Sequence, residues 1–326
     1  METPPGTTLS TPSPTELHDQ DPVTTEMNRV ALRSSPIYLV VATTSCSVQS
    51  GNGASQTRLG IGLNGQLPWP MIKADMAYFK EVTEKGAGAA KSTTANTVIM
   101  GRKTYFSIPE KFRPLTERRN VIVTRSSVCE VSRQVLDGLL ARQQQAKTWA
   151  QAKFGDDWIE ASEKYKEGIT MQELKRLKLA HAALQADYED DNKRAQVSAD
   201  NDSVASVYVC TTPDTAVEVA EPHEGGIFCI GGSEIYGTFL RDEKLRPRLR
   251  ILQTEIQKVN STEHFDCDTF WPEELSEANG WKEAAPQDVA AWTGIDMPQK
   301  DFDWANDEKV GVRLRVRGWK QMVKQA

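Results

Sequence analysis

The sequence has few cysteines and histidines, and their spacing argues against several kinds of site. Its five cysteines are odd in number, scattered and never arranged as C-x-x-C. This pattern favours reduced thiols in a cytosolic protein over a disulfide framework or a zinc site. The four histidines lie far apart, so no metal site is expected. No apolar run is long enough to cross a bilayer, and a net charge of -6 argues against nucleic acid or an anionic membrane as the main partner.

Lysine and arginine are missing from the start of the chain, where the first of them is Arg29. Residues 1–35 are rich in Pro, Ser and Thr and cannot bury enough apolar surface to offset their ordering entropy. A mitochondrial presequence would be basic, whereas this segment contains Glu16, Asp19 and Asp21. We therefore expect a disordered tail over 1–35, on a cytoplasmic protein whose folded domain covers 36–326.

Short β-branched runs recur along the rest of the chain. They cover residues 37–44, 97–101, 120–124, 207–210 and 227–232, and helix-like or loop segments separate them. This order is typical of βαβ units in a largely parallel sheet. Residues 310–318 instead alternate apolar side chains with arginine, which predicts an antiparallel strand at or near an edge, and 248–256 carries a weaker form of that signal. The predicted fold is a three-layer α/β protein with a mostly parallel central sheet and an antiparallel C-terminal strand.

The strand pattern stops between about 127 and 205. Thr170 and Glu173 have the spacing of a capping box, and Leu174, Leu177, Leu184 and Tyr188 fit one helical stripe. We interpret this segment as a mainly helical insertion of two or three helices, followed by a polar, mobile stretch over 187–203. Decoration of the surface is the simpler interpretation, and binding of a partner is the alternative.

The stretch "LGIGLNGQLPWPMIKADMAYFK" (59–80) places three glycines in a loop before a helix that begins near Ile72. On that helix Asp75 shares a stripe with Met76, Phe79 and Val82. Asp75 could simply favour the helix dipole. Alternatively, a carboxylate in apolar surroundings could bind the paired N–H groups of a flat heterocycle, on which Phe79 stacks.

Three predicted strands end in groups that suit phosphate. "IGGSEIY" follows one strand, and "MGRKT" and "VTR" end two others. Taken alone, the Gly-Gly pair could simply form a turn, and each basic residue could simply be a solvated surface charge. Together they favour a dinucleotide along the carboxyl edge of the sheet. Arg102 and Arg125 suit an added 2′-phosphate, hence NADPH rather than NADH. The absence of G-x-G-x-x-G disfavours an ordinary Rossmann domain.

Taken in order, these segments resemble the dihydrofolate reductase family. The matching stretches are LVVATT, LGIGLNGQLPWP, DMAYF, VIMGRKTYFSIPEKFRPL, RRNVIVTR, FCIGGSEIY, LQTEI and DCDTFWPE. They run from about Ile37 to Arg317 in the family's order, outside the insertions. The resemblance implies reduction of 7,8-dihydrofolate by NADPH in one-carbon metabolism and tetrahydrofolate biosynthesis, with a hydride delivered to C6 and a proton to N5. It also implies sensitivity to antifolate inhibitors, and we expect a monomer.

The resemblance assigns substrate and catalytic roles. Asp75 would bind the pterin N3 and 2-amino group with support from Thr254, Phe79 would stack on the ring, and Arg118 would bind the glutamate α-carboxylate. Leu67 and Trp69 would belong to a loop that closes over the nicotinamide. The implied catalytic residues are Asp75, Leu67, Trp69 and Thr254. The implied substrate residues are Val40, Val41, Asp75, Met76, Phe79, Ser107, Ile108, Leu115, Arg118, Ile230, Tyr236 and Thr254.

The resemblance likewise implies the NADPH site. Ala42 and Ile61 would contact the nicotinamide, residues 231–234 would hold the diphosphate across a cis Gly231–Gly232 bond, and the basic strand ends would hold the adenosine with its 2′-phosphate. The implied cofactor residues are Ala42, Gly60, Ile61, Gly62, Gly65, Gln66, Gly101, Arg102, Lys103, Thr104, Thr124, Arg125, Ser126, Gly231, Gly232, Ser233, Glu234, Ile235 and Tyr236.

Two alternatives stay open at this stage. One is an NADPH-dependent reductase of the riboflavin-pathway type, against which Asp75, Trp69 and Arg118 argue because that substrate has no glutamate tail. The other is a non-catalytic scaffold that binds a partner through the insertion. The longer link over 47–58 and the identities of Met76 and Lys80 depart from the family's pattern, so loop closure and affinity for the folate tail do not follow from the resemblance.

Overall fold

The structure is a computed structural model that describes residues 35–49, 55–85, 94–161, 168–189, 193–202, 204–223, 225–259, 263–295 and 303–322. Residues 1–34 of the predicted tail lie outside this range.

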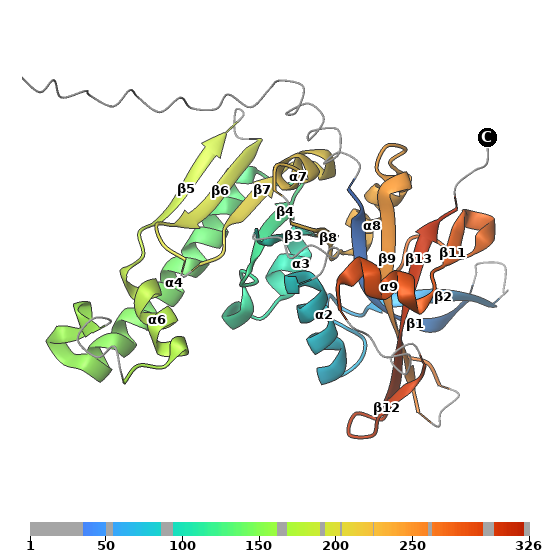
Figure 1. Ribbon diagram of the computed structural model, residues 1–326, viewed down its shortest axis with the longest axis horizontal. Helices are drawn as coiled ribbons and strands as arrows, with labels where there is room; N and C mark the ends of the chain where they lie inside the picture. The colour runs from blue at the N-terminus through green and yellow to red at the C-terminus, as the bar shows by residue number, and fades with distance from the viewer. Residues whose placement is uncertain are drawn as a thin grey trace, which may run out of the picture.

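One sheet runs through the described residues in the strand order β11-β13-β9-β1-β8-β3-β4-β7-β6-β5 (Figure 1). The strands on this path are β1 (Ile37–Gln49), β3 (Asn96–Gly101), β4 (Arg118–Val123), β5 (Leu184–Glu189), β6 (Arg194–Ala199), β7 (Val207–Cys210), β8 (Ile227–Cys229), β9 (Leu249–Lys258), β11 (Trp281–Glu283) and β13 (Val312–Gln321). Off this path, β2 (Ser55–Gly62) pairs with β1 and with β10 (Thr269–Phe270), while β12 (Ala305–Asp307) pairs with β13.

The strands from β9 to β7 are mutually parallel, and antiparallel strands extend the sheet at both ends. β13 pairs antiparallel with β9 at one end, and β6 pairs antiparallel with β7 at the other. The predicted α/β class, with a mostly parallel sheet and an antiparallel C-terminal strand, is confirmed.

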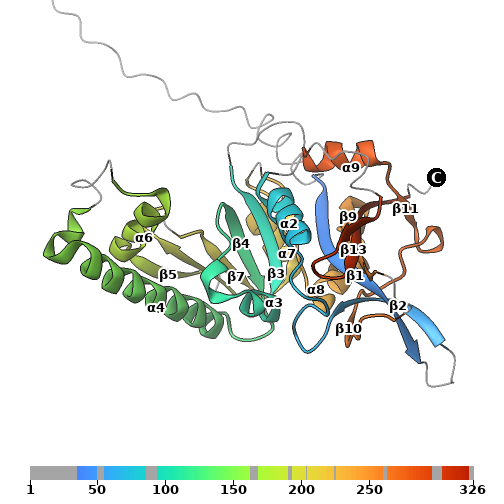
Figure 2. The ribbon, with the colours of Figure 1, turned by 90° about the horizontal axis from the view of Figure 1, so that it is seen from below.

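Helices cover both faces of the sheet (Figure 2). They are α2 (Lys73–Lys85), α3 (Arg102–Ser107), α4 (Val128–Phe154), α6 (Met171–His181), α7 (Pro213–Ala220), α8 (Ser233–Arg241) and α9 (Pro286–Thr293), with 3-10 turns η1 (Glu110–Phe112), η2 (Gly155–Ile159), η3 (Arg246–Arg248) and η4 (Glu277–Asn279). Side chains of β1 alternate between the faces, as expected of a strand. Tyr38 and Val40 pack in the cluster that includes α2, α4 and α9, whereas Ile37, Leu39 and Val41 pack with α7 and α8.

Segment 127–205 contains the predicted helices and also two strands that were not predicted. The capping box of Thr170 and Glu173 begins α6. The prediction that Leu184 and Tyr188 continue a helical stripe is wrong, because α6 ends at His181 and both residues lie on β5. The stretch over 187–203, expected to be mobile, supplies part of β5 and all of β6, which pair as an antiparallel ribbon at the end of the sheet (Figure 1).

Two further expectations need correction. Residues 249–256 belong to β9, which lies inside the sheet, parallel to β1 on one side and antiparallel to β13 on the other, and not at an edge. Gly60 and Gly62 do not lie in a loop, because β2 extends through Gly62 and Thr44 of β1 pairs with Gly60. A Cβ on Gly60 would lie 2.2 Å from the sulfur of Cys267, so this glycine permits close packing. Gly65, with φ +75°, does lie in the turn that follows.

Candidate active site

Asp75 is a buried carboxylate in the first turn of α2, with 7% of its surface exposed. Burial raises the pKa of its carboxyl group, while a hydrogen bond from Thr254 on β9 lowers the pKa and only partly offsets that effect. The neighbouring Tyr78 hydroxyl is buried and has no hydrogen-bond partner among the described residues. A carboxyl group and a hydroxyl group therefore lie in an apolar setting that costs stability unless a ligand uses them.

Helix α2 arranges a row of side chains that leads away from Asp75. Phe79 lies four residues and Thr83 eight residues further along, so the three share one helical face. Eight residues of helix rise roughly 12 Å. Phe79 and Ile108 both pack against the core cluster that contains Leu115. The row therefore runs from a carboxylate, past an aromatic ring and apolar side chains, to Thr83.

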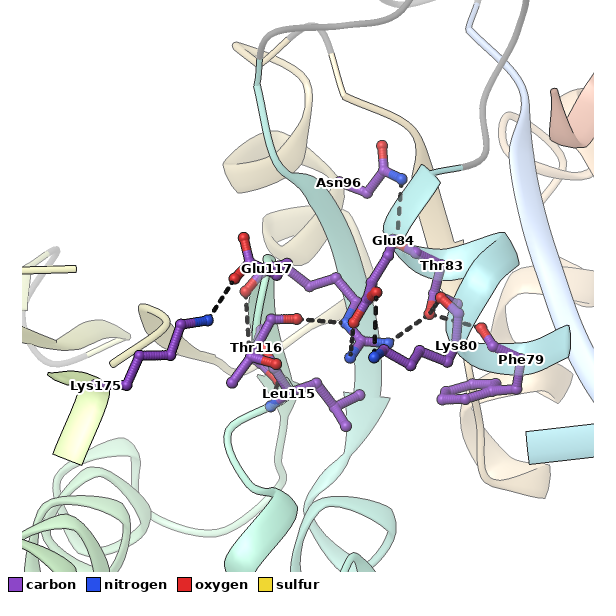
Figure 3. A network of polar contacts seen from close by, with 11 residues as sticks. Phe79, Lys80, Thr83, Glu84, Asn96, Leu115, Thr116, Glu117 and Lys175 are labelled. Carbon is purple, nitrogen blue, oxygen red and sulfur yellow. Dashed lines mark hydrogen bonds and ion pairs between the residues drawn. The ribbon is translucent and has the colours of Figure 1, made fainter. Parts of the chain in front are cut away.

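Arg118 lies at the far end of this row, on β4, and contacts Thr83 and Glu84 of α2, which Figure 3 labels. Its Nη1 donates to Oγ1 of Thr83 at 2.7 Å, its Nη2 to Oε1 of Glu84 at 3.1 Å, and its Nε to the carbonyl of Thr116 at 2.9 Å. Burial lowers the pKa of the guanidinium, and Glu84 opposes this effect. The row thus has the carboxyl group of Asp75 at one end. At the other end is the guanidinium of Arg118, which already pairs with Glu84.

Trp69 lies near the N-terminal end of α2, where it packs in a cluster with Ile72 and Ile256, with Ala42 of β1 against it. The Trp69 ring is buried and meets Phe265 edge-to-face with centroids 6.0 Å apart. Its indole Nε1 has no hydrogen-bond partner among the described residues. The structure thus brings Trp69 and Ala42 together, whereas Leu67 of the same loop is exposed.

The ends of β3 and β8 meet at two helix N-termini. The Gly101 N–H donates to the Gly231 carbonyl at 2.7 Å, which joins the two strand ends. Neither Gly101 before α3 nor Gly232 before α8 offers a side-chain cap. The Gly231–Gly232 bond is cis, as the resemblance implies, and Gly231 has φ +100°. A Cβ at Gly231 would lie 2.9 Å from the Tyr236 ring. This cradle of bare backbone N–H groups suits a diphosphate.

The basic residues proposed for the 2′-phosphate lie beside this cradle. Arg102 and Lys103 begin α3. Arg125, after β4, pairs with Glu234 of α8 at 3.0 Å, and both side chains are exposed, so the pair contributes little and yields readily to a phosphate. Thr124 is buried, and its hydroxyl accepts from the Ser126 N–H. The donors present fit a phosphorylated dinucleotide.

The other predicted site residues differ in their surroundings, and several make hydrogen bonds within the protein. The Tyr236 hydroxyl donates to the Val40 carbonyl at 2.5 Å, which leaves that carbonyl one further lone pair. The Ile230 N–H donates to the Ile99 carbonyl, and the Ser107 hydroxyl to the Thr104 carbonyl. Val41 is a core residue, and Met76 is exposed on α2. Ile61, Gln66 and Ile235 are assigned by the resemblance alone.

The sequence analysis missed three residues at the Arg118 end. Thr83 and Glu84 contact the guanidinium, and Asn120 holds the loop that carries Leu115 and Arg118. Thr83 could have been found, since it continues the Asp75–Phe79 spacing by one more helical turn. Asn120 could not, because its partners are main-chain atoms.

The described part of the chain contains no cluster of three His, Cys, Asp or Glu side chains placed to hold a metal ion. Nor does any helix within it combine the length and apolar character needed to cross a membrane.

Comparisons with known proteins point to one enzyme family. A family model described as dihydrofolate reductase matches residues 53–159. The chain is 28% identical over 271 residues to a dihydrofolate reductase of Schizosaccharomyces pombe, an alignment that covers 81% of this chain and 45% of that protein. It is 47% identical over 72 residues to the enzyme of Rattus norvegicus and 51% identical over 73 residues to that of Candida albicans, covering 22% of this chain each time. These two alignments span 37% and 36% of the relatives' own lengths, so the chain spans less than half of each.

Proposed function

We propose that this chain, a relative of the dihydrofolate reductases, catalyses the NADPH-dependent reduction of 7,8-dihydrofolate to 5,6,7,8-tetrahydrofolate. The observation that carries the proposal is Asp75, a carboxylate held by Thr254 in apolar surroundings. A matching flat heterocycle would present two N–H donors to it, as the pterin does at N3 and its 2-amino group.

The row on α2 accounts for the rest of the substrate. Phe79 would stack on the pterin, and Ile108 and Leu115 would line the groove for the benzoyl group. Arg118 contacts Thr83, which lies roughly 12 Å along the helix from Asp75, and there the glutamate of the tail would end. Because hydride transfer needs two flat rings in register, the contribution of these residues is positioning.

The residues around the glycine cradle would hold NADPH. The N–H groups that begin α3 and α8 would bind its diphosphate, Arg102 and Arg125 its 2′-phosphate, and Ala42 would contact its nicotinamide. Bound NADPH supplies the hydride that C6 of the substrate accepts.

The protein would also control the access of water to the site and the protonation of N5. Trp69 packs with Ile72, which lies three residues before Asp75, and exposed Leu67 would move to admit a water that protonates N5. Asp75 would not touch N5; by binding the opposite edge of the pterin it would raise the basicity of N5.

An NADPH-oxidation assay with dihydrofolate tests the proposal. Asp75→Asn would replace a charged acceptor of two hydrogen bonds, each worth about 1.5–3 kcal/mol. We therefore expect kcat/KM to fall roughly 10²- to 10⁴-fold. Glu81→Gln makes the same charge change on α2 where the carboxylate pairs with Lys85, and it should leave the rate unchanged. Turnover that survives in Asp75→Asn would contradict the assignment, and a wild-type protein without turnover would refute the function.

A further inference from the structure

The guanidinium of Arg118 is already bonded at all three nitrogens. Its partners are the Thr116 carbonyl, the Thr83 hydroxyl and the Glu84 carboxylate (Figure 3). A guanidinium binds a carboxylate most strongly through two parallel N–H groups. One of the nitrogens that a substrate carboxylate would use is therefore bonded to a carboxylate of the protein itself.

The Arg118–Glu84 pair is shielded from solvent. The side chains are 5% and 15% exposed, and their N–O distance is 3.1 Å. Charges this far from water are screened little by salt. The second oxygen of Glu84 faces the ammonium group of Lys80 at 3.9 Å, and the Lys80 side chain is 65% exposed. Glu84 thus stands between a buried cation and one that reaches into solvent.

We propose that Glu84 is a specificity-determining residue that occupies Arg118 in place of the substrate's α-carboxylate. This inference rests on the proposed function. An incoming carboxylate must either bind beside Glu84, against its negative charge, or displace it toward Lys80. In the first case repulsion from Glu84 opposes the new contact, and in the second the new contact replaces an existing one, so the glutamate tail adds little to binding either way. The protein therefore accepts dihydropterins with and without an anionic tail more evenly than a free arginine would allow.

A comparison of two substrates in one preparation tests this proposal. The substrates are 7,8-dihydrofolate and the tail-less 6-methyl-7,8-dihydropterin, and the measured quantity is the ratio of their kcat/KM values. Misfolded protein cancels from that ratio. Glu84→Gln keeps an oxygen that can accept from Arg118 but removes the competing charge. Glu81→Gln on the same helix, which pairs with Lys85, is the matched control.

We expect Glu84→Gln to raise the dihydrofolate preference about ten- to a hundredfold, the value of one hydrogen bond between charged groups. The gain should lie in KM for dihydrofolate, and it should vanish in the double variant Glu84→Gln with Arg118→Gln. Should Glu84→Gln fail to fold, Glu84→Asp carries the test, since its shorter side chain withdraws from Arg118 and should shift the ratio in the same direction.

An unchanged ratio in both Glu84 variants would overturn the inference, even if their stability fell, because a purely structural ion pair affects the two substrates equally. A fall in dihydrofolate preference would also overturn it. If the wild type reduces neither substrate, the proposed function fails instead, so the two failures are distinguishable.

Discussion

Asn120 offers the sharpest test of how the fold supports the Arg118 end of the site. Its side chain is fully buried. Oδ1 accepts from the Leu115 N–H at 2.9 Å, and Nδ2 donates to the carbonyls of Leu115 and Arg118 at 2.9 and 3.0 Å. One amide therefore satisfies three main-chain groups of the loop that enters β4.

Asn120→Ala removes all three bonds. Each buried polar group left without a partner costs about 1–3 kcal/mol. Because the loop can relax toward water, we expect a loss near the lower end of the sum, about 3–5 kcal/mol of unfolding free energy.

Asn120→Asp has the same shape but replaces the donor with an oxygen that faces two carbonyls. Its ionised form is disfavoured in the folded state, so its folded pKa must exceed the unfolded value of about 3.9. The folded state then binds the proton more tightly, and stability falls as pH rises from about 4 through the raised pKa. Asn120→Ala shows no such dependence relative to wild type.

Urea unfolding at pH 5 and pH 8, followed by tryptophan fluorescence, measures both effects. A loss below about 1 kcal/mol in Asn120→Ala would refute the reasoning. So would an Asn120→Asp protein whose stability difference from wild type is the same at both pH values, because the three bonds would then not hold the loop.

Three other perturbations follow from the structure. Burial raises the pKa of Asp75, so ionisation of Asp75 lowers the stability of the folded state as pH rises from 3.8 through the raised pKa. Asp75→Asn should therefore unfold at a higher urea concentration than wild type at pH 8. Equal unfolding midpoints would contradict this. Gly60→Ala would place a Cβ 2.2 Å from Cys267 Sγ and should lower the free energy of unfolding by about 1–3 kcal/mol, measured in urea. In the control Gly138→Ala on α4, the Cβ meets nothing within 4 Å, and the free energy of unfolding should rise by up to about 1 kcal/mol. Tyr236→Phe removes the hydrogen bond to Val40 and should cost about 1 kcal/mol, checked by the same method; no loss would mean that this bond is not maintained in solution.

The sequence predicted the parallel core of the sheet well because its strands are buried on both faces. β1, β3, β4 and β7 each contain a short run rich in β-branched residues, and such a run can be recognised without knowledge of the neighbouring strands. Helix spacing also placed Asp75 and Phe79 on one face of α2.

The features that the sequence did not predict depend on contacts between residues that are distant in sequence. β5 and β6 contain many polar side chains because one face is exposed, and only their pairing with each other and with β7 makes them strands. Nothing local distinguishes β9 as an interior strand. The pairing of Glu84 with Arg118 joins residues 34 positions apart, so a single acidic residue on a helix gives no hint of it.

The ribbon of β5 and β6 also covers the outer edge of β7. β7 is an apolar strand whose outer side pairs with β6 from Val197↔Val207 to Arg194↔Cys210. Excision of 127–205 would leave that side with a row of unpaired N–H and C=O groups, a template for joining another chain edge to edge. A shortened protein should therefore self-associate at micromolar concentration, while the present chain ends its sheet on a largely exposed, charged strand that discourages such growth.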